Sequence, residues 1–239
     1  MEISNFWVYF AARPLFWIVI TLICFLIATW LNRKAGGTAL LHPVFVSMVL
    51  IITLLVLTET DYNTYFEGAQ FIHFLLGPAT VALAVPLFDH LAKIRRLLIP
   101  VLVTCIFGSV FAASSVLVMG VLMGGDVRLL LSLAPKSVTS PIAIGISEQI
   151  GGYPSLSAGL ALSTGIIGCI LAPMVFKLIK IQSETAKGFS LGLSAHGFGT
   201  AYAMQTSALA GAFAGLAMGL TGVFSSLLIP VIVKLFGIS

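Results

Sequence analysis

The chain has 239 residues, of which 59% are hydrophobic and only 8% are charged. A soluble domain typically carries about 25% charged residues, so these few charges cannot cover a water-soluble globule, and the excess apolar surface must face lipid. The net charge of +4 comes from short basic clusters between apolar runs, which is typical of cytoplasmic loops. We therefore expect a protein in the lipid bilayer and no nucleic-acid partner.

Five apolar runs are long enough, or nearly long enough, to cross a hydrocarbon core of about 30 Å as helices. In chain order they cover residues 14–31, 43–57, 97–123, 154–179 and 209–236. The apolar stretches that carry proline, glycine or hydroxyl residues at their centres are 71–88, 129–150 and 188–205. The sequence predicts an all-α polytopic membrane protein with about seven to eight membrane segments, some of them discontinuous or re-entrant.

Basic clusters predict the orientation, because lysine and arginine accumulate in cytoplasmic loops. They lie at 33–34, 93–96 and 177–187. The run 97–123 therefore starts in the cytoplasm and the run 154–179 ends there, so both ends of 129–150 lie on the outer side. An intact spanning helix cannot return to its own side, whereas a re-entrant segment can if protein or a watery cavity satisfies its backbone.

A weak internal repeat appears when the chain is shifted by 57 positions, which places residues 77–81 over 134–138 and Gly108 over Gly165. Corresponding interrupted segments in two halves of a membrane protein mark transporter binding sites. This predicts two inverted repeats, although unrelated apolar stretches that contain proline would align equally well. Pro78 and Thr80 then become candidate binding residues, in an uncharged counterpart of the segment around Lys136.

The segment 133–143 combines one lysine, hydroxyl groups and two prolines within an apolar run. Its polar side chains belong to Lys136, Ser137, Thr139 and Ser140. Pro135 and Pro141 predict an unwound stretch and a restarted helix, whose free N–H groups attract an anion. A lysine at this depth costs about 2.5–3.5 kcal/mol, so we expect Lys136 to bind an anion. The alternatives are a structural pair with Glu148 or a side chain that reaches the interface.

The segment 188–205 supplies a second set of candidate binding residues. They are His196, Gly197, Gly199 and Thr200. The glycines allow the backbone to approach a ligand closely. His196 either titrates as a proton-linked switch or forms a structural hydrogen bond beside a tight helix crossing.

Signatures of an enzyme are missing from the sequence. Lys136 lacks the Ser-x-x-Lys spacing of a serine–lysine hydrolase, and no acidic residue is placed to orient His196 beside Ser194. The four histidines show no metal-ligand spacing, and the three cysteines each fall inside an apolar run. We therefore predict no catalytic residue, no metal and no cofactor.

Three blocks of the sequence together resemble the LrgB/CidB family, in the right order and across nearly the whole chain. They are residues 77–87, 135–143 and 195–201. The resemblance implies a single LrgB-like transmembrane domain over residues 1–239. It also implies a multi-pass protein of the bacterial cytoplasmic (inner) membrane.

Members of that family are described as antiholin-like or holin-like proteins linked to murein hydrolase regulation and autolysis. A plant plastid relative exchanges glycolate and glycerate, and bacterial pairs are tied to pyruvate. The resemblance thus implies a transporter of small monocarboxylates that works beside a small LrgA-like membrane protein, and a homo-oligomer is compatible with it. Relatives often carry arginine and an acidic residue where this chain has Tyr202 and Gln205, which leaves the substrate preference open.

Two functions follow from these observations. The first is transport of small organic anions such as glycolate, glycerate or pyruvate, with the carboxylate bound at the broken helix around Lys136. The alternative is a holin-like or antiholin-like protein that modulates murein hydrolase activity and autolysis with its LrgA-like partner.

Overall fold

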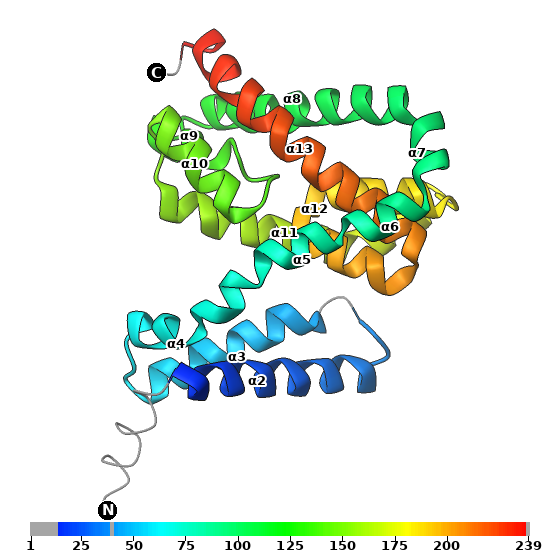
Figure 1. Cartoon of the computed structure of the whole chain (residues 1–239). Coiled ribbons are helices and arrows are strands. Elements are labelled where there is room, and N and C mark those ends of the chain that lie inside the picture. The colour runs from blue at the N-terminus through cyan, green and yellow to red at the C-terminus, as the bar shows by residue number, and fades with distance from the viewer. Residues whose placement is uncertain (1–13, 39–40, 238–239) are drawn as a thin grey trace, which may run out of the picture. The chain divides into compact units, whose positions relative to one another are not determined.

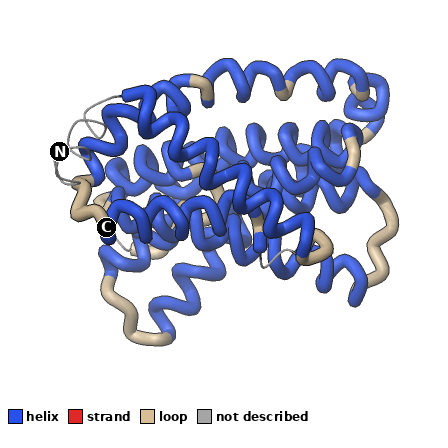
Figure 2. Tube along the Cα trace, turned by 90° about the horizontal axis from the view of Figure 1, so that it is seen from below, coloured by secondary structure: helices blue, strands red, loops and turns tan. Residues whose placement is uncertain are grey.

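The computed structural model describes residues 14–38 and 41–237, and these residues form helices and loops without any strand (Figure 1, Figure 2). Contacts divide the chain into two compact units, which comprise residues 1–82 and 83–239.

The first unit is built around α2. Its helices are α2 (Pro14–Lys34), α3 (Pro43–Leu57), α4 (Tyr62–Phe74) and α5 (Leu76–Ala82). The fully buried Trp17 ring meets the Tyr65 ring edge-on, with 5.6 Å between their centroids. The Thr21 hydroxyl lies 3.1 Å from the Tyr65 hydroxyl. These contacts fix the beginning of α4 against α2.

The second unit contains the remaining helices. They are α6 (Ala84–Asp89), α7 (Leu91–Arg96), α8 (Leu98–Leu122), α9 (Val127–Leu133), α10 (Ser140–Ile150), α11 (Pro154–Leu178), α12 (Glu184–Thr206) and α13 (Ala208–Leu235). Its largest core cluster joins Leu117 of α8, Ile146 of α10 and Ile229 of α13. The α13 helix packs against α6, α8, α10 and α12, and so lies at the centre of this unit (Figure 1).

Five helical stretches among the described residues are long and apolar enough to cross a membrane. They are Leu15–Lys34, Tyr62–Asp89, Leu98–Leu122, Pro154–Leu178 and Ala208–Leu235. Large apolar side chains remain exposed along them, for example Leu122 at 81% and Phe107 at 68%. This surface is what the composition predicts for helices that face lipid.

The predicted membrane segments agree with these helices in most places. The expected runs 14–31, 97–123, 154–179 and 209–236 each match one spanning helix to within about three residues at either end. The expected run 43–57 is the shorter apolar helix α3. The stretch 71–88 lies within the span Tyr62–Asp89, which consists of three short helices. The other two stretches, 129–150 and 188–205, are broken, so the count of seven to eight segments remains a prediction.

The first broken segment, which we name hairpin 1, consists of α9, the turns 134–139 and α10. Its two ends lie together, as the orientation argument predicted for 129–150. Arg128 Nε donates a hydrogen bond to the Gly151 carbonyl oxygen over 3.3 Å, and the Tyr153 N–H donates to Ser132 Oγ over 2.7 Å. Its arms are about 10 and 16 Å long at 1.5 Å per residue, too short to cross a 30 Å core.

The second broken segment, hairpin 2, is α12, whose arms 184–195 and 197–206 meet at His196. Contacts with α13 show that the arms run in opposite directions. Gly188 and Gly192 of the first arm pack against Ala210 and Ala214. In the second arm, Met204 packs against Gly211, and the earlier residue Thr200 contacts Met218, further along α13. The first arm is thus parallel to α13 and the second arm is antiparallel to it.

The ends of hairpin 2 also lie together. Ser207 Oγ, at the beginning of α13, donates a hydrogen bond to Glu184 Oε2 over 2.8 Å. A straight helix of this length would separate those ends by more than about 30 Å. The sequence predicted an interruption in 188–205 but not this reversal.

Candidate functional site

The lysine segment forms the tip of hairpin 1. Pro141 lies in the first turn of α10, whose N-cap residue is Thr139, so the helix restarts where the sequence predicted. The N–H groups of a first helical turn have no acceptor within their own helix, which favours an anion at this position. Within the described part of the chain, the side chains of Ser137 and Thr139 form no hydrogen bond.

Lys136 is half-buried at this tip. No ion pair joins it to Glu148, which is exposed on α10, in the portion of the chain that the structure describes. The described structure therefore does not contain the structural pair of Lys136 and Glu148 that the sequence left open as an alternative. The ammonium group is available to an anion that approaches the tip.

The histidine segment forms the tip of hairpin 2. His196 is 3% exposed and has φ 39° and ψ −121°, a conformation that interrupts the helix. Its Nε2 lies 2.9 Å from the Ala161 carbonyl oxygen, and since a carbonyl only accepts, Nε2 carries the hydrogen. Thr200 Oγ1 donates to the His196 carbonyl oxygen over 2.8 Å. These two bonds tie the break to α11 and to the second arm of the hairpin.

Glycine permits the fold-back at this tip. A side chain at Gly199 would overlap the Leu191 carbonyl group, because the second arm begins directly against the first. A side chain at Gly165 of α11 would come within 2.8 Å of both His196 and Phe198. Gly197, by contrast, has open space where a Cβ would lie.

Both tips lie against the same part of α11. Ser140 Oγ in hairpin 1 donates to the Ala158 carbonyl oxygen over 3.4 Å, and His196 in hairpin 2 bonds the Ala161 carbonyl. These two carbonyls are three residues apart, about 4.5 Å along the helix, and share one face. The structure thus brings the lysine and histidine segments to a common position on α11.

The remaining predicted residues, Pro78 and Thr80, lie on α5 in the first unit. Pro78 is exposed within that unit, and the side chain of Thr80 lies outside the described part of the structure. Their role in binding remains a prediction.

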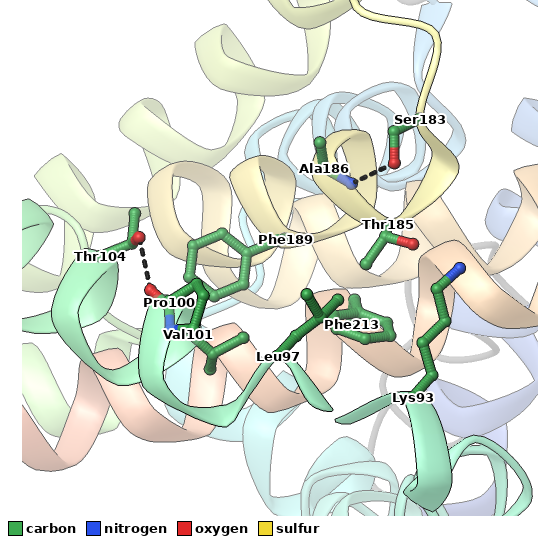
Figure 3. Close-up of a pocket in the computed structure, with 10 residues that line it drawn as sticks. All are labelled: Lys93, Leu97, Pro100, Val101, Thr104, Ser183, Thr185, Ala186, Phe189 and Phe213. Atoms are coloured by element: carbon green, nitrogen blue, oxygen red, sulfur yellow. Dashed lines mark hydrogen bonds between the residues drawn. The ribbon is translucent and has the colours of Figure 1, made fainter. Parts of the chain in front are cut away.

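Two cavities adjoin the first arm of hairpin 2, near its ends rather than its tip. The first, of about 300 Å³, lies between α7, α8, hairpin 2 and α13. Figure 3 shows the side chains of Lys93 and Thr185 at one end of it and Phe189 beside Thr104 and Pro100 at the other.

The second cavity, of about 490 Å³, lies between the end of α11, both arms of hairpin 2 and the beginning of α13. Its polar lining includes Lys177, Lys180, Lys187 and Tyr202. In the sequence these lysines served only as markers of orientation. Their clustering directly before the interrupted stretch 188–205 was the available signal for a shared cavity.

No group of three histidine, cysteine, aspartate or glutamate side chains is arranged to hold a metal ion within residues 14–38 and 41–237. The geometry at the two tips instead offers an ammonium group, hydroxyl groups and backbone N–H groups, which together suit a small oxyanion.

Comparison of the sequence with known proteins identifies the family of this chain. The LrgB-like family matches residues 21–235. An antiholin-like protein LrgB of Bacillus subtilis (strain 168) is 33% identical over 224 residues, which cover 94% of this chain and 97% of the relative. Proteins of the same name from Bacillus cereus (strain B4264) and Bacillus anthracis (strain CDC 684 / NRRL 3495) are 31% identical over the same shares. No solved structure matches the chain.

The match covers nearly the full length of the chain and of its relatives. Five apolar helices in the described residues agree with a multi-pass protein of a bacterial membrane. The chain belongs to the LrgB-like family, as its three sequence blocks indicated.

Proposed function

We propose that this chain has an antiholin-like function in the bacterial membrane and works beside a small LrgA-like membrane protein. The observation that carries this proposal is the similarity, over 94% of the chain, to relatives named antiholin-like protein LrgB. In this function the protein restrains murein hydrolase activity and autolysis. The relatives' names support it better than they support the transport function that the sequence favoured.

The antiholin-like proposal predicts the phenotype of a deletion strain. Removing the gene from its host should increase murein hydrolase activity and speed detergent-induced autolysis, and the intact gene should reverse both changes. Zymography of cell extracts and the decline of culture turbidity measure these effects. Unchanged autolysis in the deletion strain would contradict the proposal.

Transport of small organic anions is a second candidate function, and one specific observation favours it. Two hairpin tips, one with a lysine that lacks an ionic partner among the described residues, lie against neighbouring carbonyls of α11. Broken helices whose ends point at a solute are a recurrent design of transporter binding sites. If hairpin 1 enters the bilayer as the sequence predicts, a lysine at its tip is costly, and such residues usually serve a function.

In this second function Lys136 would attract the carboxylate of a monocarboxylate such as glycolate, glycerate or pyruvate. The hydroxyl groups of Ser137 and Thr139 and the first turn of α10 would donate hydrogen bonds to it. His196, Gly197, Gly199 and Thr200 would line the opposite side. Pro78 and Thr80 remain proposed substrate-binding residues from the sequence pattern alone.

We propose an inverted repeat for the same function, which extends the 57-residue shift seen in the sequence to the hairpins. The 57-residue shift pairs α8 with α11 and hairpin 1 with hairpin 2, since Leu98 falls on Ser155 and Val127 on Glu184. Each half would then consist of one spanning helix followed by one hairpin. Two such halves of opposite orientation would place their tips at a common depth.

Purified protein in liposomes tests the transport function through Lys136. Wild-type protein should accumulate radiolabelled glycolate, glycerate or pyruvate, and Lys136→Ala should reduce uptake at least about tenfold because the half-buried charge that pairs with the carboxylate is gone. Lys234→Ala, at the end of α13, is the matched control and should retain wild-type uptake.

The same liposomes separate the two functions. Selective uptake that depends on Lys136 would establish transport, whereas unselective leakage of an entrapped dye would indicate a pore. If the Lys136→Ala gene reverses the deletion phenotype as fully as the intact gene does, the antiholin-like function does not need the anion site. If uptake is equal in wild type and Lys136→Ala, the site assignment is wrong.

A further inference from the structure

The cavity at the open end of hairpin 2 has the composition of a binding site. Its volume is about 490 Å³, and its walls come from the end of α11, both hairpin arms and the beginning of α13. Lys177, Lys180 and Lys187 supply positive charge, and Phe176 and Leu191 supply apolar wall.

Positive charge dominates this cavity. The three lysines face one acidic residue, Glu184, so the formal balance of these groups is 3 − 1 = +2. Glu184 Oε2 accepts a hydrogen bond from Ser207 Oγ. No ion pair between Glu184 and the lysines is present in the described structure. An anion that enters the cavity would therefore meet ammonium groups that lack an ionic partner there.

The backbone at Lys180 forms the turn that ends α11. Its φ of 56° is left-handed, and the Ile181 N–H bonds the Phe176 carbonyl oxygen over 2.9 Å to end α11. Helices that end in this way usually place glycine at the left-handed residue. This turn places Lys180 at the wall of the cavity, between α11 and hairpin 2.

The surface beside the cavity is strongly apolar. Met174, Leu178 and Ile179, in the last turns of α11 and just after it, are 67%, 75% and 59% exposed. An occupant with a charged head and an apolar tail would place the head among the lysines and the tail along α11. A small free anion would use only the first of these two surfaces.

We infer that this cavity binds the headgroup of an anionic phospholipid, with an acyl chain on the exposed face of α11. The lysine cluster marks the cytoplasmic side, and basic pockets between membrane helices on that side bind anionic headgroups. The bound lipid would link α11 to both arms of hairpin 2. This site is separate from the two tips and does not depend on the proposed functions.

Native mass spectrometry of the full-length protein in mild detergent tests this inference. With equal amounts of phosphatidylglycerol and phosphatidylcholine added, the wild type should retain phosphatidylglycerol preferentially. The triple variant Lys177→Gln, Lys180→Gln, Lys187→Gln should bind it at least about tenfold more weakly, given the contribution of each basic residue near a lipid headgroup. Replacing the same three lysines by arginine should preserve binding.

A control triple variant, Arg33→Gln, Lys34→Gln, Lys234→Gln, loses the same net charge at positions that do not line the cavity and should bind phosphatidylglycerol like the wild type. Circular dichroism and gel filtration establish that each variant is folded. The inference is overturned if the lysine-to-glutamine variant binds phosphatidylglycerol as tightly as the control does. It is also overturned if inorganic phosphate or glycolate displaces the lipid at equal concentration, because the cavity would then select a free anion.

Discussion

The backbone of His196 adopts φ 39° and ψ −121° in the middle of α12. Such a conformation costs about 1–3 kcal/mol in a non-glycine residue. The Nε2 bond to Ala161 and the Thr200 bond to the His196 carbonyl each return about 1 kcal/mol. Of the two roles that the sequence left open for His196, the structure contains the structural hydrogen bond. The proton-linked role remains untested.

Glycine substitutions at this tip should distinguish the effect of a steric clash from the effect of reduced backbone flexibility. Gly199→Ala should lower the free energy of unfolding by about 1–3 kcal/mol, because its Cβ would overlap the Leu191 carbonyl group. Gly197→Ala, where a Cβ meets nothing within 4 Å, is the matched control. Thermal unfolding in detergent measures both. Equal melting temperatures for the two variants would show that the arms do not approach each other at Gly199.

At the scale of elements, the two hairpins are closed in different ways. Hairpin 1 is closed by a buried cluster of Ser132, Ser147 and Ser157, all fully buried. Ser157 Oγ lies 2.8 Å from Ser147 Oγ and 2.9 Å from the Ser132 carbonyl oxygen. Hairpin 2 is closed at its ends by the exposed Glu184–Ser207 hydrogen bond. Exposed polar contacts stabilise less than buried ones, so hairpin 2 should open more readily.

Removing the central hydroxyl of the serine cluster should therefore loosen hairpin 1. Ser157→Ala should cost about 1–3 kcal/mol, because it leaves a buried acceptor without its donor. Ser163→Ala removes an exposed hydroxyl that bonds only the Gly159 carbonyl of its own helix, and should change stability by less than about 0.5 kcal/mol. Hydrogen exchange across residues 127–150 measures the effect. Unchanged exchange in Ser157→Ala would show that the cluster does not hold the arms together.

At the scale of the whole molecule, the long apolar helices were predictable because their boundaries depend on local composition. The expected run 97–123 is α8 (Leu98–Leu122), and 154–179 is α11 (Pro154–Leu178). The restart of α10 was predictable for the same reason, since Pro135 and Pro141 act on their own neighbours.

Features that depend on distant contacts were not predictable from the sequence. The reversal of α12 depends on the hydrogen bond between Glu184 and Ser207 and on Gly188 and Gly192, which pack against α13. No local sequence pattern predicts such pairings. The meeting of both tips on α11 rests on the carbonyls of Ala158 and Ala161. Every residue carries such a group, so composition could not single them out.

The shared position of the two tips on α11 has a thermodynamic consequence. Hairpin 1 contacts α11 at Ala158 and hairpin 2 contacts it at Ala161. The position of one tip on α11 therefore affects the contacts that the other tip can make. An anion at the tips and a lipid at the open end of hairpin 2 would then both act on one mechanical element. Linkage requires their effects to be reciprocal: each must change the affinity of the other by the same factor.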